Sequence, residues 1–229
     1  MPGSPRLARR WWPWLLAGLA VLALAGGLSW VLLVSSLFDA RSVQVVGVRE
    51  LPVDEARAAA AVPLGTPMLL LDTKGIQARV AAVPRVASVR VHSTLDGTVW
   101  LELTERTPAA VVRRGTGVHL VDATGIDYAA VPVRPPGVPE LRVDRVGPRD
   151  AATAAALTVL TGLPEPLRAR VHVLAARSPA DVVLRLDDGR EVRWGGVEQS
   201  DRKAAVLGPL LTQPGKIYDV SSPTLPTIV

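Results

Sequence analysis

The chain has 229 residues, of which 48% are hydrophobic and 4% aromatic, and it contains no cysteine. Without cysteine it cannot have a disulfide scaffold, a thiolate metal site or a cysteine nucleophile. The formal net charge is +5, but Arg6, Arg9 and Arg10 supply three of these charges, and the nearly balanced remainder predicts no basic stripe and no nucleic-acid partner.

A long uncharged stretch follows the N-terminal arginines. No ionisable side chain occurs between Trp11 and Phe38, and residues 15–34 alone would form roughly 30 Å of helix, about one hydrocarbon thickness. We therefore predict a transmembrane helix over residues 11–37, inserted in the lipid bilayer. The positive-inside rule makes residues 1–10 a cytoplasmic tail and places the rest of the chain outside the cytoplasm.

Two alternatives exist for this stretch. Residues 23–25 have the small-x-small form that a signal peptidase cleaves, and a soluble protein could bury the stretch as a core helix. The apolar run is longer than the roughly 7–15 residues of a signal peptide, and it lacks the polar face of a soluble helix. A permanent anchor fits both observations better.

The residues after the anchor predict a small module at residues 38–107. β-branched and alternating runs indicate strands, while apolar residues three and four apart, such as Ile76, Val80 and Val83, indicate a helix. The expected elements are a strand at 42–48, helices from Pro52 to Pro63 and from Asp72 to Pro84, and strands at 86–92 and 98–105. Their order, β-α-α-β-β, predicts an α+β fold.

Residues 108–222 predict a second, β-rich domain with flanking helices. A proline-rich link at 132–139 interrupts it, and Asp187, Asp188 and Gly189 form the turn of its clearest hairpin. The expected strands are at 111–112, 118–121, 171–175, 182–186, 191–194 and 216–220, and the expected helices at 151–163 and 197–211. Residues 223–229, rich in Ser, Thr and Pro, are expected to be a C-terminal tail.

Catalytic chemistry finds no support in the sequence. Glu50, Asp54 and Glu55 lie at a predicted helix start, where carboxylates interact with the helix dipole. His119 lies on an apolar strand, which is more typical of a packed residue than of a base or ligand. None of the common hydrolase, phosphate-loop or metalloprotease motifs occurs. We expect no enzyme, no cofactor, no metal and no small-molecule substrate.

Two sets of segments carry recognisable motifs. The first set is residues 43–48, 84–91 and 98–109, above all the run Thr104-Glu105-Arg106-Thr107-Pro108-Ala109, and the second set is residues 119–125, 203–207 and 217–223. The first set resembles the POTRA module, and the second the C-terminal β domain, of the FtsQ/DivIB family of bacterial cell-division proteins. The resemblance implies a non-catalytic, single-pass divisome protein of the cell membrane at the division septum. Such a protein binds FtsB (DivIC in Gram-positive bacteria) and FtsL, and helps regulate septal peptidoglycan synthesis.

The last predicted strand is a candidate partner site. Its middle is apolar, so a partner strand could pair with it if it forms a sheet edge, although from the residues alone it could equally end the sheet's interior. The resemblance favours the edge, because the family's partner site is placed on this strand and the preceding helix. The expected partner-binding residues are Arg202, Lys203, Leu207, Ile217, Tyr218, Asp219, Val220 and Ser221.

Two other function classes share parts of this organisation. A membrane-tethered extracytoplasmic sensor would have the same topology, and a POTRA-type assembly or translocation component would share the first module. Identification of the binding partner would separate these alternatives from a divisome protein.

Overall fold

The computed structural model describes residues 12–34, 39–94, 96–115 and 117–229. The chain divides into two compact units, Met1–Glu105 and Arg106–Val229. Each unit combines helices with a sheet, so the expected α+β class is confirmed. The predicted cytoplasmic tail, residues 1–10, lies outside the described residues, as do Trp11 and residues 35–37 of the predicted transmembrane helix.

Helix α1 (Trp12–Val34) has 23 residues, with no acidic residue in its first turn and no basic residue in its last. Its large apolar side chains that the structure describes are exposed, from 61% for Leu16 to 79% for Trp14. Within the described part of the chain, no helix meets the length and apolarity required to cross a membrane.

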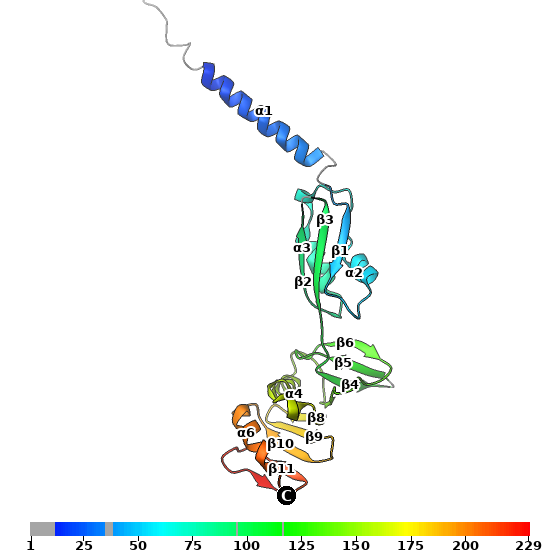
Figure 1. Ribbon diagram of the computed structural model, residues 1–229, viewed down its shortest axis with the longest axis vertical. Helices are drawn as coiled ribbons and strands as arrows, with labels where there is room; N and C mark the ends of the chain where they lie inside the picture. The colour runs from blue at the N-terminus through cyan, green and yellow to red at the C-terminus, as the bar shows by residue number, and fades with distance from the viewer. Residues whose placement is uncertain (1–11, 35–38, 95, 116) are drawn as a thin grey trace, which may run out of the picture. The chain divides into compact units, whose positions relative to one another are not determined.

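The rest of the first unit is built on a three-stranded sheet of order β1-β3-β2 (Figure 1). β1 pairs with β3 in parallel and β2 pairs with β3 antiparallel. The elements are β1 (Ser42–Val46), α2 (Val53–Ala60), the 3₁₀ helix η3 (Met68–Leu70), α3 (Thr73–Ala81), β2 (Val86–Ser93) and β3 (Thr98–Glu105). The predicted order of strands and helices is therefore confirmed, with η3 as an addition.

The core of this unit follows from the periodicity of its helices. Ile76 and Val80, one turn apart on α3, are almost completely buried, as are Val99 and Leu101 on β3. The side chain of Asp72 caps α3 by accepting a hydrogen bond from the Gly75 backbone N–H at 2.8 Å. Helix α3 thus begins one residue after Asp72, the predicted starting residue.

β1 ends at Val46, two residues before its predicted end. Gly47 has a φ of +87°, which favours glycine, and a Cβ at this position would collide with the carbonyl oxygen of Leu103. The chain therefore turns away from the sheet at Gly47 instead of continuing the strand.

The carboxylate of Glu105 holds the loop that follows this turn. It accepts hydrogen bonds from the backbone N–H groups of Arg49, Glu50 and Leu51 at 2.7–3.1 Å. Burial opposes the ionisation of Glu105, but these three N–H donors outweigh it and keep the pKa of its carboxyl below the ordinary value. Glu105 therefore fixes the end of β3 to the start of α2.

The second unit contains a nine-stranded sheet of order β12-β11-β10-β9-β8-β7-β4-β5-β6. Its strands are β4 (Ala110–Arg114), β5 (Gly117–Val121), β6 (Asp127–Val131), β7 (Glu140–Arg142), β8 (Val171–Ser178), β9 (Asp181–Leu186), β10 (Glu191–Gly195), β11 (Ile217–Asp219) and β12 (Thr227–Ile228). Its helices are α4 (Ala151–Gly162), α5 (Glu165–Arg168) and α6 (Ser200–Leu210). The predicted hairpin is β9–β10, paired antiparallel.

Four of these elements were not predicted: β6, β7, α5 and β12. β6 and β7 lie on either side of the proline-rich link, where proline masks the strand pattern although it is tolerated at strand ends. β7 has three residues and β12 two, too few to display an alternating pattern. The predicted tail, residues 223–229, therefore contains a strand.

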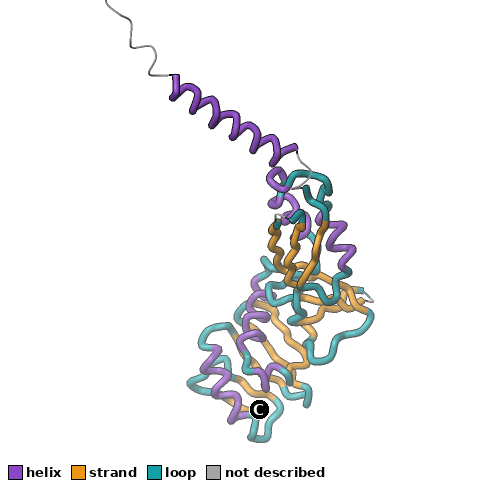
Figure 2. Tube along the Cα trace, turned by 45° about the horizontal axis from the view of Figure 1, so that its top comes forward, coloured by secondary structure: helices purple, strands orange, loops and turns teal. Residues whose placement is uncertain are grey.

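Helices α4 and α6 lie on one side of strands β8 to β11 (Figures 1 and 2). The main core of the unit includes Leu157 of α4, Leu184 of β9, Trp194 of β10 and Leu207 of α6. The indole N–H of Trp194 donates to the Ser200 hydroxyl at 3.2 Å, which satisfies its only polar atom. The helices therefore cover one face of these strands (Figure 1).

An ion pair between a buried aspartate and a half-buried arginine lies near the start of the second unit. Arg106 donates to Asp122 at 2.5 Å, and their side chains are 16% and 8% exposed. Asp122 also accepts from the Thr124 N–H and hydroxyl and from the Ile126 N–H, at 2.7–2.9 Å. Burial opposes ionisation, but these donors outweigh it and keep the pKa of the Asp122 carboxyl low. The turn after β5 is thus organised around one carboxylate.

Candidate docking surface

The expected partner-binding residues fall into two groups in the structure. Lys203, Leu207, Tyr218 and Val220 are buried, each at most 2% exposed. The accessible group consists of the exposed Arg202 and Ser221 and the half-buried Ile217 and Asp219. Leu207 of α6 and Tyr218 of β11 contribute to the same core, and we call this place the α6–β11 junction. Half of the expected partner-binding side chains are buried there.

Lys203 was one of the expected partner-binding residues, and the structure buries it. Its ammonium group donates to the Gly196 carbonyl at 2.8 Å, and burial lowers its pKa, with the nearby Glu198 carboxylate acting in the opposite direction. The structure shows a buried lysine that ties α6 to the end of β10, so Lys203→Glu would test folding and not an exposed charge.

Tyr218 is also a structural residue. Its hydroxyl donates to the Gln213 carbonyl at 2.7 Å and lies 3.1 Å from the Gly215 carbonyl. The guanidinium of Arg190 lies over its ring, 5.6 Å from the centroid. Tyr218 therefore fixes the loop between α6 and β11.

β11 is not the edge of the sheet, which corrects the expectation of a free edge at residues 217–220. β10 pairs with one side of it in parallel and β12 with the other side antiparallel, with Tyr218 opposite Ile228. Ile217 and Val229 exchange both of their backbone hydrogen bonds at 2.9 Å. In an antiparallel pair of strands, hydrogen-bonded residue pairs alternate with pairs that are not hydrogen-bonded. The next pair, Tyr218 and Ile228, is therefore not hydrogen-bonded, and the N–H and C=O of Ile228 point away from β11. The edge at this end of the sheet is β12.

Arg190 connects the β9–β10 hairpin to this junction. It pairs with Asp188 in the hairpin turn at 2.7 Å and donates to the Leu211 carbonyl at the end of α6 at 2.7 Å. Its hydrogen bond lowers the pKa of Asp188 to about 2. One arginine thus holds the hairpin turn, α6 and Tyr218 together.

We predict that the Asp188 carboxylate stabilises the second unit in a pH-dependent way. Because its folded pKa is about 2, below the ordinary 3.8, its contribution is present above pH ~4 and disappears as the pH falls towards ~2. Thermal unfolding of the wild type and Asp188→Asn between these values measures this, and the difference should shrink as the pH falls. Asp144→Asn, an exposed position, is the control. A pH-independent difference would contradict the prediction.

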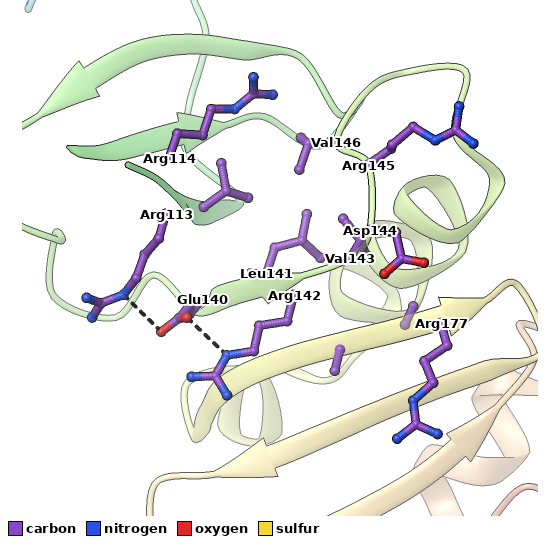
Figure 3. Close-up of a pocket in the computed structure, with 13 residues that line it drawn as sticks. Arg113, Arg114, Glu140, Leu141, Arg142, Val143, Asp144, Arg145, Val146 and Arg177 are labelled. Atoms are coloured by element: carbon purple, nitrogen blue, oxygen red, sulfur yellow. Dashed lines mark hydrogen bonds and ion pairs between the residues drawn. The ribbon is translucent and has the colours of Figure 1, made fainter. Parts of the chain in front are cut away.

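Arginines line two neighbouring hollows of the second unit. Figure 3 shows Arg113, Arg114, Arg142, Arg145 and Arg177 around a hollow of about 830 Å³, with apolar side chains such as Leu141 and Val146 between them. A second hollow, of about 430 Å³, shares Arg142 and Arg177 and adds Arg185 and Arg193. We call this surface, with both hollows, the arginine face.

Glutamates pair with some of these arginines without neutralising the face. Glu140 lies 3.7 Å from Arg113 and 3.0 Å from Arg142, and Glu191 lies 3.6 Å from both Arg185 and Arg193. The hydrogen bond from Arg142 lowers the pKa of Glu140, although burial opposes this. The guanidinium groups of Arg145 and Arg177 have no hydrogen bond or ion pair to other described residues. Across both hollows, seven arginines face four carboxylates, and a fifth carboxylate, that of Asp127, lies 3.1 Å from Arg114.

The arginine face was not predicted from the sequence, where only the net charge along the chain was considered. Its arginines come from β4, β7, β8, β9 and β10 and from the segment after β7. They are far apart in sequence, and the sheet topology brings them together. The sequence offered one sign of this surface. Arg177, Arg185 and Arg193 each lie on a strand whose side chains alternate between buried and exposed, and each is at an exposed position.

Comparison with known proteins relates both units to one family. The family described as "POTRA domain, FtsQ-type" matches residues 38–106, and "Cell division protein FtsQ/DivIB, C-terminal" matches residues 110–221. The cell division protein FtsQ of Streptomyces bingchenggensis is 36% identical over 225 residues, covering 93% of this chain and 84% of that protein. The chain belongs to the FtsQ/DivIB family of cell division proteins.

Other relatives agree with this assignment. FtsQ of Mycolicibacterium smegmatis is 44% identical over 209 residues, covering 91% of this chain. The chain spans 61–66% of the length of the mycobacterial FtsQ proteins that it resembles. The major extracytoplasmic domain of DivIB from Geobacillus stearothermophilus covers 43% of this chain at 21% identity, with a TM-score of 0.34, too low to support an argument.

The structure gives a physical role to the FtsQ-like run at residues 104–109. Glu105 holds the loop before α2 in the first unit, and Arg106 forms the ion pair with Asp122 in the second. Pro108 then precedes β4. The two adjacent charged residues of this run therefore serve different units of the FtsQ fold.

Proposed function

We propose that this FtsQ-family chain is a non-catalytic docking protein of the bacterial divisome. Its partners are FtsB/DivIC-like and FtsL-like proteins, and through them it helps regulate septal peptidoglycan synthesis. The observation that carries the proposal is the combination of an open sheet edge at β12 with the arginine face across neighbouring strands.

The edge of β12 suits the addition of a partner strand. A sheet edge offers unpaired backbone groups, and a partner that pairs with them gains main-chain hydrogen bonds. The N–H and C=O of Ile228 point away from β11, because Ile228 lies next to the hydrogen-bonded pair of Ile217 and Val229 and opposite Tyr218. Ser221 and Asp219, at the end of β11, are accessible beside this edge.

The arginine face suits acidic side chains of the same partner. Seven arginines and four carboxylates line the two hollows, and Asp127 pairs with Arg114 at 3.1 Å, so an excess of two positive charges remains. Such an excess steers an acidic segment to the surface and selects against a basic one. The apolar side chains on the floor of the larger hollow, including Leu141 and Val143, favour a polypeptide with apolar residues among its carboxylates.

We further propose that residues 11–37 anchor the protein in the cell membrane, with the N-terminus in the cytoplasm and both units outside. The uncharged run between Trp11 and Phe38 and the three arginines before it support this topology. An anchor would confine the docking surface to the membrane, where a septal partner is found.

Ile228→Pro tests the edge. It removes the outward N–H while proline remains tolerated on an edge strand, so we expect partner affinity to fall by about 1–3 kcal/mol, because a partner carbonyl loses its donor. Binding of a purified FtsB-type extracytoplasmic segment is measured by calorimetry. Ile228→Val keeps the N–H and most of the side chain, and should bind like the wild type. Unchanged affinity of a folded Ile228→Pro variant would exclude β12 from the interface.

A further inference from the structure

Three leucines of the first unit remain exposed within seven residues of one another. Leu64, Leu69 and Leu70 are 59%, 66% and 63% exposed. Leu69 and Leu70 belong to η3, and Leu64 lies just before Gly65, in the loop between α2 and α3. Single exposed apolar residues are common on protein surfaces, but a cluster of large ones marks an interaction site. We call these three residues the leucine patch.

The same loop is fixed to the point where the chain enters the unit. Asp39 forms a β-bridge with Pro67. The Ala40 N–H donates to the Thr66 carbonyl at 2.9 Å, and the Gly65 N–H donates to the Ala40 carbonyl at 2.8 Å. The leucine patch therefore flanks the entry point of the chain.

The covalent chain limits how far this entry point can be from α1. Four residues, 35–38, separate Val34 at the end of α1 from Asp39. Five residue steps extend to about 17 Å at most. The interfacial layer outside the hydrocarbon core adds about 5–8 Å on each side of a bilayer. If α1 crosses the membrane, as the proposed function states, the entry point cannot leave the vicinity of the bilayer surface.

We propose that the leucine patch inserts into the interfacial layer of the outer leaflet and docks the POTRA-type unit on the lipid surface. The proposal rests on the membrane anchor of the proposed function. The tether keeps the patch at high effective concentration next to the bilayer, so a few apolar side chains suffice for contact. The charges nearby are mixed, with Lys74 exposed on α3 and Asp72 at its start, so contact does not require anionic lipid.

The absence of cysteine makes the chain suitable for site-specific labelling. Single cysteines at Leu69, Val21 and Val53 would carry an environment-sensitive fluorophore in the full chain, reconstituted in phosphatidylcholine vesicles with spin-labelled lipids. Val21 lies within α1 and reports on the anchor. Val53 is the matched control, because it is 40% exposed at the start of α2. It follows the loop held by Glu105, at the opposite end of β3 from Asp39.

The expected result is a blue-shifted emission at position 69 with quenching by lipids labelled near the headgroup, and neither at position 53. Position 21 should be quenched by lipids labelled deep in the acyl chain. Quenching at 21 without quenching at 69 would overturn the lipid contact and leave the anchor intact. Absence of quenching at 21 would overturn the anchor and the lipid contact with it.

Two further outcomes would also overturn the proposal. Equal quenching at 69 and 53 would mean that the whole unit lies on the bilayer and that the leucine patch has no special role. A blue shift at 69 that appears only after a partner protein is added would assign the patch to a protein and not to lipid.

Discussion

An Asp122→Ala variant is expected to lose about 3–5 kcal/mol of the unfolding free energy of the second unit, because it removes the buried carboxylate that pairs with the half-buried Arg106 guanidinium and accepts the donors of the following turn. Asp122 is 6% exposed and accepts four hydrogen bonds, from Arg106, Thr124 and Ile126. Urea unfolding of residues 39–229 measures the loss, and hydrogen exchange identifies the unit that opens.

Two variants serve as controls for this prediction. Asp122→Asn keeps a side-chain oxygen that can accept the N–H groups of Thr124 and Ile126, and we expect an intermediate loss. Asp144→Ala, which removes an exposed carboxylate, should stay within about 0.5 kcal/mol of the wild type. A loss below about 1 kcal/mol for Asp122→Ala would show that the pair does not organise the turn.

Reversing two charges on the arginine face should weaken binding strongly. We expect the double variant Arg177→Glu, Arg193→Glu to weaken an acidic partner segment by about 2 kcal/mol, or roughly thirtyfold, since each change replaces an attraction of up to about 1 kcal/mol with a repulsion. Calorimetric titration at low and high salt measures this. The difference from the wild type should narrow at high salt because mobile ions screen exposed charges.

The matched control reverses two arginines outside the face. Arg90 and Arg168 have side chains that are 87% and 44% exposed, and each pairs with a glutamate, as Arg193 does. The double variant Arg90→Glu, Arg168→Glu changes the net charge by the same amount and should bind nearly as the wild type does. Equal weakening by both variants would indicate a general charge effect and would remove the arginine face from the proposed interface.

The long periodic segments of the fold could be predicted from the sequence. α3 shows helical spacing at Ile76 and Val80, and both residues lie in the core. The β9–β10 hairpin followed from its turn residues. β12 could not be predicted, because two residues near prolines are too few to show the alternation of apolar and polar residues that indicates a strand. They form a strand because they pair with β11.

The candidate site was predictable only in part. The junction of α6 and β11 was recognised, but the orientation of α6 was not. Lys203 and Leu207 lie four residues apart and share the buried face, so a residue chosen for its charge proved to be internal. The arginine face depends on strand order, which brings Arg142 of β7 next to β8 and Arg193 of β10 next to β9. Net charge along the sequence carries no information about such neighbours.

The bridging glutamates have a consequence for how this surface can evolve. Glu140 and Glu191 each contact two arginines, so replacing one glutamate by glutamine would release two guanidinium groups at once and raise the surface charge by one unit. No strand needs to move for this. Single substitutions at these two positions can therefore adapt the arginine face to a more acidic or a less acidic partner. The partner and the arginine face can evolve together in small steps while the fold stays the same.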